Sequence, residues 1–170
     1  MNTDNKPATG SERELVLTRI INAPREKVYR AWTEPALLKQ WFAPLPWTTP
    51  VAETDVRPGG SSLFVMRDPD GKEFLNRGVY LEVVKNERLV FTDAYVNAWE
   101  PSDKPFMTAI LTFEDEGGKT KYAARAKHWT VADREQHEKM GSIKGGRNAP
   151  TSLRPLWLGF ERVKSALRRR

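Results

Sequence analysis

The chain has 170 residues, 39% of them hydrophobic and 10% aromatic, which suits one globular domain with a single core. It contains no cysteine, which excludes disulfides and thiolate metal sites, and residues 1–14 carry no apolar run that could serve as a signal peptide or membrane span. We therefore expect a cytoplasmic protein with no membrane span, a disordered leader over 1–11 and a single domain over 12–168.

The formal net charge of +6 arises at the end of the chain. Residues 1–140 hold 20 Lys and Arg against 21 Asp and Glu, whereas residues 141–170 hold 8 Lys and Arg against Glu161 alone. A nucleic-acid-binding face needs basic side chains interleaved with aromatic ones across folded elements. Because residues 1–140 offer no such face, we expect no nucleic-acid partner.

The first elements are a strand and two short helices. Residues 14–24, ELVLTRIINAP, are β-branched and apolar up to an Ala-Pro pair, which predicts a strand that leads into a helix. Residues 24–32 and then 34–42 each place apolar side chains at three- and four-residue spacing, which predicts two helices in succession.

From residue 48 the apolar period changes to two, and turn sequences rich in Gly, Pro and Asn recur. This pattern predicts an antiparallel meander of six strands at 48–56, 61–67, 73–84, 88–98, 106–113 and 119–129. In 106–113 the residues Met107, Ala109, Leu111 and Phe113 alternate with Thr and Ile, so they share one face. A sheet that is apolar on one side and partly apolar on the other must be covered or must curl around something.

A C-terminal helix begins after Thr130, a favourable cap, and carries the sequence VADREQHEKMG. The helical pattern then stops at Ser142, because two glycines and two prolines follow. We predict a helix that is broken near 142–154, with a second piece from about residue 155 to 167.

The order of these elements, with the segments INAPREKVYRAWTEPALLKQWF, DVRPGGSSLFVMRDPDGKEF, RGVYLEVVKNERLVFTDAY, LTFEDEGGKTK and HEKMG, resembles the START-like (SRPBCC) superfamily. Within it, the chain is similar to bacterial proteins that resemble the C-terminal domain of the heat-shock-protein-90 ATPase activator. The resemblance covers about residues 12–141. It implies an α+β helix-grip fold, in which a seven-stranded antiparallel sheet wraps a C-terminal helix around a cavity for an apolar small molecule. Because the family shares no catalytic triad, the resemblance implies a pocket and no mechanism.

The tail departs from the resembled proteins, which usually continue the helix with an aromatic residue and a Gly-Trp pair. The loss of one base just before Ser142 would convert such a continuation into the sequence found here. Our hypothesis is that the tail from Ser142 is frame-shifted, which would also explain its excess positive charge.

Eleven residues are candidates for the cavity lining, and most of them are aromatic or Met side chains, which suit an apolar small-molecule site. They are Trp41, Trp47, Phe64, Met66, Tyr80, Phe91, Asp93, Tyr95, Phe106, Met107 and His128. Asp93 is the candidate for an inward-facing acid, since it shares the alternating face of Phe91, although exposure at a sheet edge explains it equally well. His128 is a candidate polar group in the cavity or an ordinary hydrogen-bonded histidine, and we expect His137 to be exposed to solvent.

No catalytic residue, metal site or cofactor is expected, because the two histidines are too few and too scattered to bind a metal. The leading prediction is a protein that binds a hydrophobic small molecule, lipid-like or polyketide-like, without turnover. One alternative is a polyketide-cyclase-like enzyme with an inward titratable group. The other is a co-chaperone-like interaction domain, and a homodimer remains open.

Overall fold

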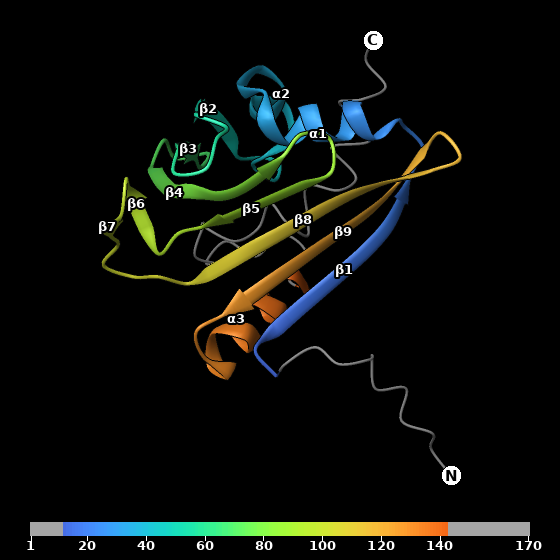
Figure 1. The fold of residues 1–170 in the computed structure, drawn as a ribbon. Helices are drawn as coiled ribbons and strands as arrows, with labels where there is room; N and C mark the ends of the chain where they lie inside the picture. The colour runs from blue at the N-terminus through green and yellow to red at the C-terminus, as the bar shows by residue number, and fades with distance from the viewer. Residues whose placement is uncertain (1–11, 143–170) are drawn as a thin grey trace.

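The computed structural model describes residues 12–142 of the chain (Figure 1). Its main sheet has seven antiparallel strands in the order β1-β9-β8-β5-β4-β3-β2. In chain order these strands are β1 (Glu14–Ile21), β2 (Thr48–Thr54), β3 (Ser61–Arg67), β4 (Glu73–Val84), β5 (Arg88–Thr92), β8 (Met107–Glu116) and β9 (Lys119–His128). The helices are α1 (Arg25–Thr33), α2 (Pro35–Trp41) and α3 (Val131–Ser142). The predicted α+β helix-grip fold is confirmed.

The two short helices after β1 form because each carries a narrow apolar stripe and begins beside a proline. Pro24 precedes α1 in an extended conformation, and Pro35 occupies the first turn of α2, where its missing N–H costs nothing. The stripe of α1 is buried, and Tyr29 meets Phe113 of β8 edge to face with ring centroids 5.7 Å apart. Figure 1 shows α1 and α2 at one end of the curved sheet and α3 at the other.

The long hairpin of β8 and β9 follows the predicted alternation. The four side chains of β8 that were predicted to share a face are all buried, and Tyr122 and His128 of β9 lie on the same side. The turn between the strands uses Gly117 and Gly118 at φ of 62° and 83°, values that favour glycine. The inner face of the sheet is therefore continuous from β1 through β8.

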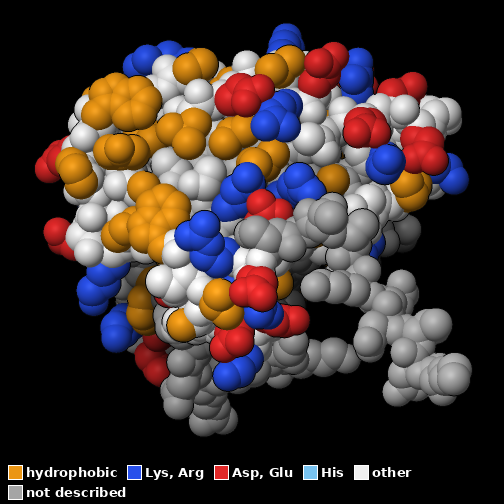
Figure 2. Space-filling model, turned by 60° about the horizontal axis from the view of Figure 1, so that its bottom comes forward, with side chains coloured by type: hydrophobic (Ala, Val, Ile, Leu, Met, Phe, Trp, Pro, Cys, Tyr) orange, Lys and Arg blue, Asp and Glu red, His pale blue; other side chains and the backbone are white. Residues whose placement is uncertain are grey.

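The strand predicted over 88–98 is in fact two strands in different sheets. β5 ends at Thr92, and β6 (Tyr95–Asn97) pairs with β7 (Glu100–Pro101) in a separate two-stranded ribbon. Side chains replace the strand ladder at the break, because Thr92 Oγ1 accepts the Ala94 N–H at 3.2 Å. The ribbon packs against β4 and lies at the left edge of the molecule in Figure 1, and hydrophobic side chains gather on the same side of the face shown in Figure 2.

The C-terminal helix begins as predicted, with Thr130 Oγ1 accepting the N–H of Asp133 at 3.0 Å. The Nε–H of Arg134 donates to the carbonyl of Glu12, so α3 is held against the start of β1. The predicted break near 142–154, the second helical piece and the frame-shifted tail lie outside the described residues. Among the described helices, none is both long and apolar enough to cross a membrane.

Candidate functional site

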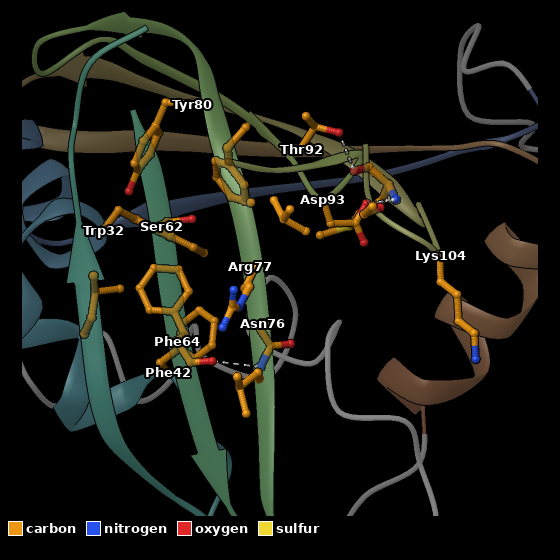
Figure 3. A pocket seen from close by; sticks show the side chains of 17 residues that line it. Trp32, Phe42, Ser62, Phe64, Asn76, Arg77, Tyr80, Thr92, Asp93 and Lys104 are labelled. Atoms are coloured by element: carbon orange, nitrogen blue, oxygen red, sulfur yellow. Dashed lines mark hydrogen bonds between the residues drawn. The ribbon is translucent and has the colours of Figure 1, made fainter. Parts of the chain in front are cut away.

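A cavity of about 300 Å³, open on one side, lies between the inner face of the sheet and the two short helices (Figure 3). It is bounded by β3, β4, β5, α1, α2 and the segment that joins β5 to β8. The lining residues are Trp32, Leu38, Phe42, Ser62, Phe64, Leu75, Asn76, Arg77, Gly78, Tyr80, Phe91, Thr92, Asp93, Val96, Ser102, Lys104 and Met107. Its volume is at the lower end of the range for small-molecule sites, which favours a compact guest.

Aromatic rings form most of one wall. Phe42 at the end of α2 packs on Phe64 of β3 with ring centroids 4.4 Å apart, and Phe91 lies 6.3 Å from Tyr80 and 6.4 Å from Trp32. Figure 3 shows the rings of Phe42, Phe64 and Tyr80 on the side of the cavity toward the short helices. Flat aromatic faces of this kind pack well against a flat apolar molecule.

Asp93 is the acidic group of the lining. Its Oδ1 accepts the backbone N–H groups of Phe106 and Met107 at 2.8 and 3.0 Å, which fixes the carboxyl group at the end of β5. Among the described residues, none forms an ion pair with it. Burial raises the pKa of Asp93, although hydrogen bonds from the backbone N–H groups of Phe106, Met107 and Asp93 itself, and the nearby His128, oppose the shift. The hydrogen bonds from Phe106 and Met107 both end on Oδ1, and neither uses Oδ2.

A second polar group, Asn76, lies in the β4 wall. Its Nδ2 is within 3.3 and 3.4 Å of the carbonyl oxygens of Phe64 and Phe74, which orients the amide. Its Oδ1 is buried without a hydrogen-bond partner, and so is Oγ of Ser102. Buried polar atoms normally have a partner, so this part of the lining has unused capacity for hydrogen bonds.

The β4 wall is also partly an open strand edge. The pairing of β4 with β5 ends at Val79, opposite Thr92, whereas β4 continues back to Glu73. Four consecutive residues, 75–78, line the cavity. Because side chains of one strand face would contribute only every second residue, the backbone of β4 must itself form part of the wall. Gly78 permits the close approach, because a Cβ there would lie 2.6 Å from the carbonyl oxygen of Thr92.

Five of the eleven predicted residues line the cavity, namely Phe64, Tyr80, Phe91, Asp93 and Met107. The inward position of Asp93 agrees with the alternation from Phe91. Burial raises the pKa of the Tyr80 phenol, with smaller contributions from Tyr29 and Asp55, so this hydroxyl stays protonated at neutral pH.

Four more of the predicted residues pack elsewhere. Trp41 is fully buried and donates its Nε1–H to the carbonyl of Ala31, and Met66 is fully buried in the core. Trp47 packs on Phe74, and Tyr95 packs on Trp99 in the turn between β6 and β7. Their aromatic or apolar character reflects packing and places none of them in the cavity wall.

The last two predicted residues belong to a buried cluster between β9 and α3. The ring of Phe106 meets the rings of His128 and His137 edge to face, at 5.4 and 5.8 Å. His128 is thus the hydrogen-bonded histidine of the two alternatives and does not line the cavity. The expectation that His137 is exposed is wrong, because its exposed fraction is 0% and it bonds to His128.

The sequence analysis missed Trp32, which looks like an ordinary helix-packing residue, and it missed Asn76. A signal for Asn76 was present. The turn at 68–71 sets the register of the β3–β4 hairpin and places Asn76 opposite Phe64, on the same face of the sheet. Within residues 12–142, no cluster of three or more His, Cys, Asp or Glu side chains could hold a metal ion.

The comparisons with known proteins agree with this geometry. The family described as activator of Hsp90 ATPase homolog 1-like protein matches residues 22–156. The chain belongs to this family. A crystal structure of a protein from Nitrosomonas europaea is 35% identical, with a TM-score of 0.82, and the match covers 94% of this chain and 96% of that one.

More distant members of the fold include a Staphylococcus epidermidis protein at 22% identity and TM-score 0.74, with 94% and 92% of the two chains covered. A Mycobacterium smegmatis protein has 21% identity and TM-score 0.68, with coverage of 92% and 88%. A search of the curated proteins found no match to this chain. The family and the START-like fold are consistent with ligand binding in general.

Proposed function

We propose that this protein binds a compact hydrophobic small molecule, lipid-like or polyketide-like, in the cavity between the sheet and the helices. The observation that carries the proposal is the half-open cavity of about 300 Å³ with an aromatic wall. A cavity of this kind, with a few fixed polar groups in an apolar lining, is the ordinary form of a small-molecule site. A cytoplasmic location, expected from the sequence, belongs to the same proposal.

The volume limits the guest. The rings of Trp32, Trp41 and Tyr122 pack together beneath α1, with centroids 4.6 and 6.2 Å from that of Trp32, so this part of the inner face is solid. The space that remains lies toward β3, β4 and β5. A molecule of one or two rings fits such a space better than a long acyl chain, which would have to extend through the open side.

The test is a fluorescence titration with N-phenyl-1-naphthylamine, which emits strongly in apolar surroundings. Ser62 lines the cavity, whereas its neighbour Ser61 is exposed and starts from the opposite face of β3. We expect Ser62→Phe to fill the cavity and weaken binding at least tenfold, and the matched Ser61→Phe variant to bind like the wild type.

Both variants must first show cooperative melting, which establishes that they fold. Equal binding by Ser62→Phe, Ser61→Phe and the wild type would place the probe elsewhere and end the proposal. Native mass spectrometry of the protein with the probe gives the stoichiometry, for which we expect one.

One observation favours a second role, a polyketide-cyclase-like enzyme. Asp93 is a carboxyl group of raised pKa at the cavity, and a general acid or base requires such a group. Turnover of a linear polyketide that is lost in Asp93→Asn would support this role. Binding without turnover supports the carrier. A chaperone partner and a homodimer are not part of either proposal.

A further inference from the structure

The part of the cavity that contains Asp93 bears on which apolar molecules can bind. This inference rests on the proposed function. Asp93 Oδ1 is occupied by two backbone N–H groups, so the carboxyl group cannot turn away from its position. Both hydrogen bonds use Oδ1, and none of the described residues forms an ion pair with Asp93, so Oδ2 remains for a guest. In Figure 3 the carboxyl group lies on the opposite side of the cavity from the rings of Phe42, Phe64 and Tyr80.

We propose that the cavity selects compact apolar molecules that carry a hydrogen-bond donor, a hydroxyl or amino group, which Asp93 Oδ2 accepts. An ionised carboxylate has acceptors alone, so its partner must donate. A guest without a donor would remove water from Oδ2 and replace it with nothing, which carries a large desolvation penalty.

Asn76 adds an acceptor to the same lining. Its two N–H positions lie toward the carbonyl oxygens of Phe64 and Phe74, so the amide cannot flip without losing both contacts. The oxygen that remains is buried and unpartnered. Asn76 therefore offers no free donor to a guest, and in Figure 3 its amide lies beside Phe64, away from Asp93.

The two cations of the lining do not reverse this preference for a donor. Arg77 follows Asn76 directly in β4, so their side chains leave the strand on opposite faces. The side chain of Lys104 is exposed and extends away from Asp93 toward α3 in Figure 3. A guest carboxylate would therefore meet Asp93 without a fixed cation beside it, and like charges in apolar surroundings repel.

The hydroxyl groups near the aromatic rings can form hydrogen bonds with guests that carry either a donor or an acceptor. Tyr80 and Ser62 line the cavity near the rings, and a hydroxyl both donates and accepts. They neither require nor exclude a donor on the guest. The selectivity consequently depends on Asp93, which makes a single substitution informative.

The experiment uses four compounds with one skeleton: 1-naphthol, 1-naphthylamine, 1-methoxynaphthalene and 1-naphthoate, titrated calorimetrically into the whole protein at neutral pH. We expect naphthol and naphthylamine to bind about tenfold more tightly than methoxynaphthalene, the ratio for one charge-assisted hydrogen bond. We expect naphthoate to bind most weakly.

Asp93→Asn sharpens the test, because its amide oxygen can keep both backbone contacts while its NH2 group replaces Oδ2 with a donor. The naphthol-to-methoxynaphthalene ratio should fall to one or below. Asp103→Asn is the matched control, since Asp103 is exposed and outside the lining, and it should keep the wild-type ratio.

The outcomes separate the two proposals. Equal binding of naphthol and methoxynaphthalene, tighter binding of naphthoate, or an unchanged ratio in Asp93→Asn would overturn donor selection while the cavity remained a binding site. Failure of all four compounds to bind, together with failure of the apolar fluorescent probe, would overturn the binding function itself and the selectivity with it.

Discussion

His137 Nδ1 of α3 lies 2.7 Å from His128 Nε2 of β9, and this hydrogen bond joins the helix to the sheet. The direction of this bond follows from the other contact of His128, with the carbonyl group of Arg13. His128 Nδ1 is 2.9 Å from the carbonyl oxygen of Arg13, and a carbonyl only accepts, so Nδ1 carries a hydrogen. In neutral His128 the Nε2 is then an acceptor, and His137 donates to it.

The first prediction concerns stability and pH. Burial lowers the pKa of His128, opposed by the hydrogen bond to Arg13 and by Asp133 and Asp93, and assisted by Arg134. The unfolded chain therefore binds a proton at a higher pH than the native protein, so stability is full above about pH 7 and falls as the pH drops through the ordinary histidine range. We expect a slope of up to about 1.4 kcal/mol per pH unit for one proton.

Urea unfolding between pH 7.5 and 5.5 measures this slope. Asp93 acts in the opposite direction, since a raised carboxyl pKa favours the native state as the pH falls toward 4. Repeating the measurement with Asp93→Asn removes that contribution, and it also removes the upward effect of Asp93 on the His128 pKa, so the slope should become steeper. A free energy of unfolding that does not change over this range would contradict the prediction.

The second prediction concerns His137 itself. In His137→Leu the Nε2 of His128 loses its donor in a buried place, so we expect a loss of about 1–3 kcal/mol in unfolding free energy. His137→Gln supplies an N–H group and should recover part of the loss. The readout is urea unfolding at pH 7.5, and equal losses in both variants would show that ring packing on Phe106 matters more than the hydrogen bond.

The third prediction separates two properties of Asp93, its hydrogen bonds to two backbone N–H groups and its buried charge. Asp93→Asn keeps an oxygen for the N–H groups of Phe106 and Met107 and removes a buried charge, so stability at pH 7 should stay equal or rise. Asp93→Ala leaves both N–H groups without their acceptor and should cost about 1–3 kcal/mol. Thermal melting compares the two variants. A larger loss of stability in Asp93→Asn than in Asp93→Ala would contradict the role of Asp93 as acceptor of the two N–H groups.

The fourth prediction tests the close approach of two strands. Gly78→Ala places a methyl group 2.6 Å from the Thr92 carbonyl oxygen and should destabilise the protein by about 1–3 kcal/mol or more. Gly71→Ala meets open space and is strained by its φ of 88° alone, which costs about 1–2 kcal/mol. If Gly78→Ala also moves the strands apart, probe binding should change with it, whereas Gly71→Ala should leave binding unaffected.

The strands of the sheet were predictable because short stretches of sequence determine them. Turn sequences such as the one at 68–71 set the hairpin registers, and alternation then assigns each side chain to a face. The break after Thr92 was not predictable in this way. Residues 88–98 keep a strand-like composition, and the break depends on Asp93 bonding to backbone groups thirteen and fourteen residues away.

The cavity was predictable in kind and only partly in its residues. Alternation identifies the inner face, which contains Phe64, Phe91 and Met107, but it cannot tell which part of that face the helices fill. Trp41 fills space and Trp32 borders the void, although both lie on short amphipathic helices. His137 was misjudged for a related reason, since a charged helix gives no sign of which polar residue meets a buried partner.

The polar attachment of α3 also affects how the protein responds to temperature. Among side chains 131–139 the buried one is His137, while Val131 and Ala132 are exposed. Release of this stretch would uncover one side of the Phe106 ring and little other apolar surface, so the heat capacity should change less than when the aromatic interior melts. Cooling that weakens the hydrophobic core should therefore leave α3 bound to the sheet. Release of α3 and unfolding of the core should then appear as separate transitions in a calorimetric scan.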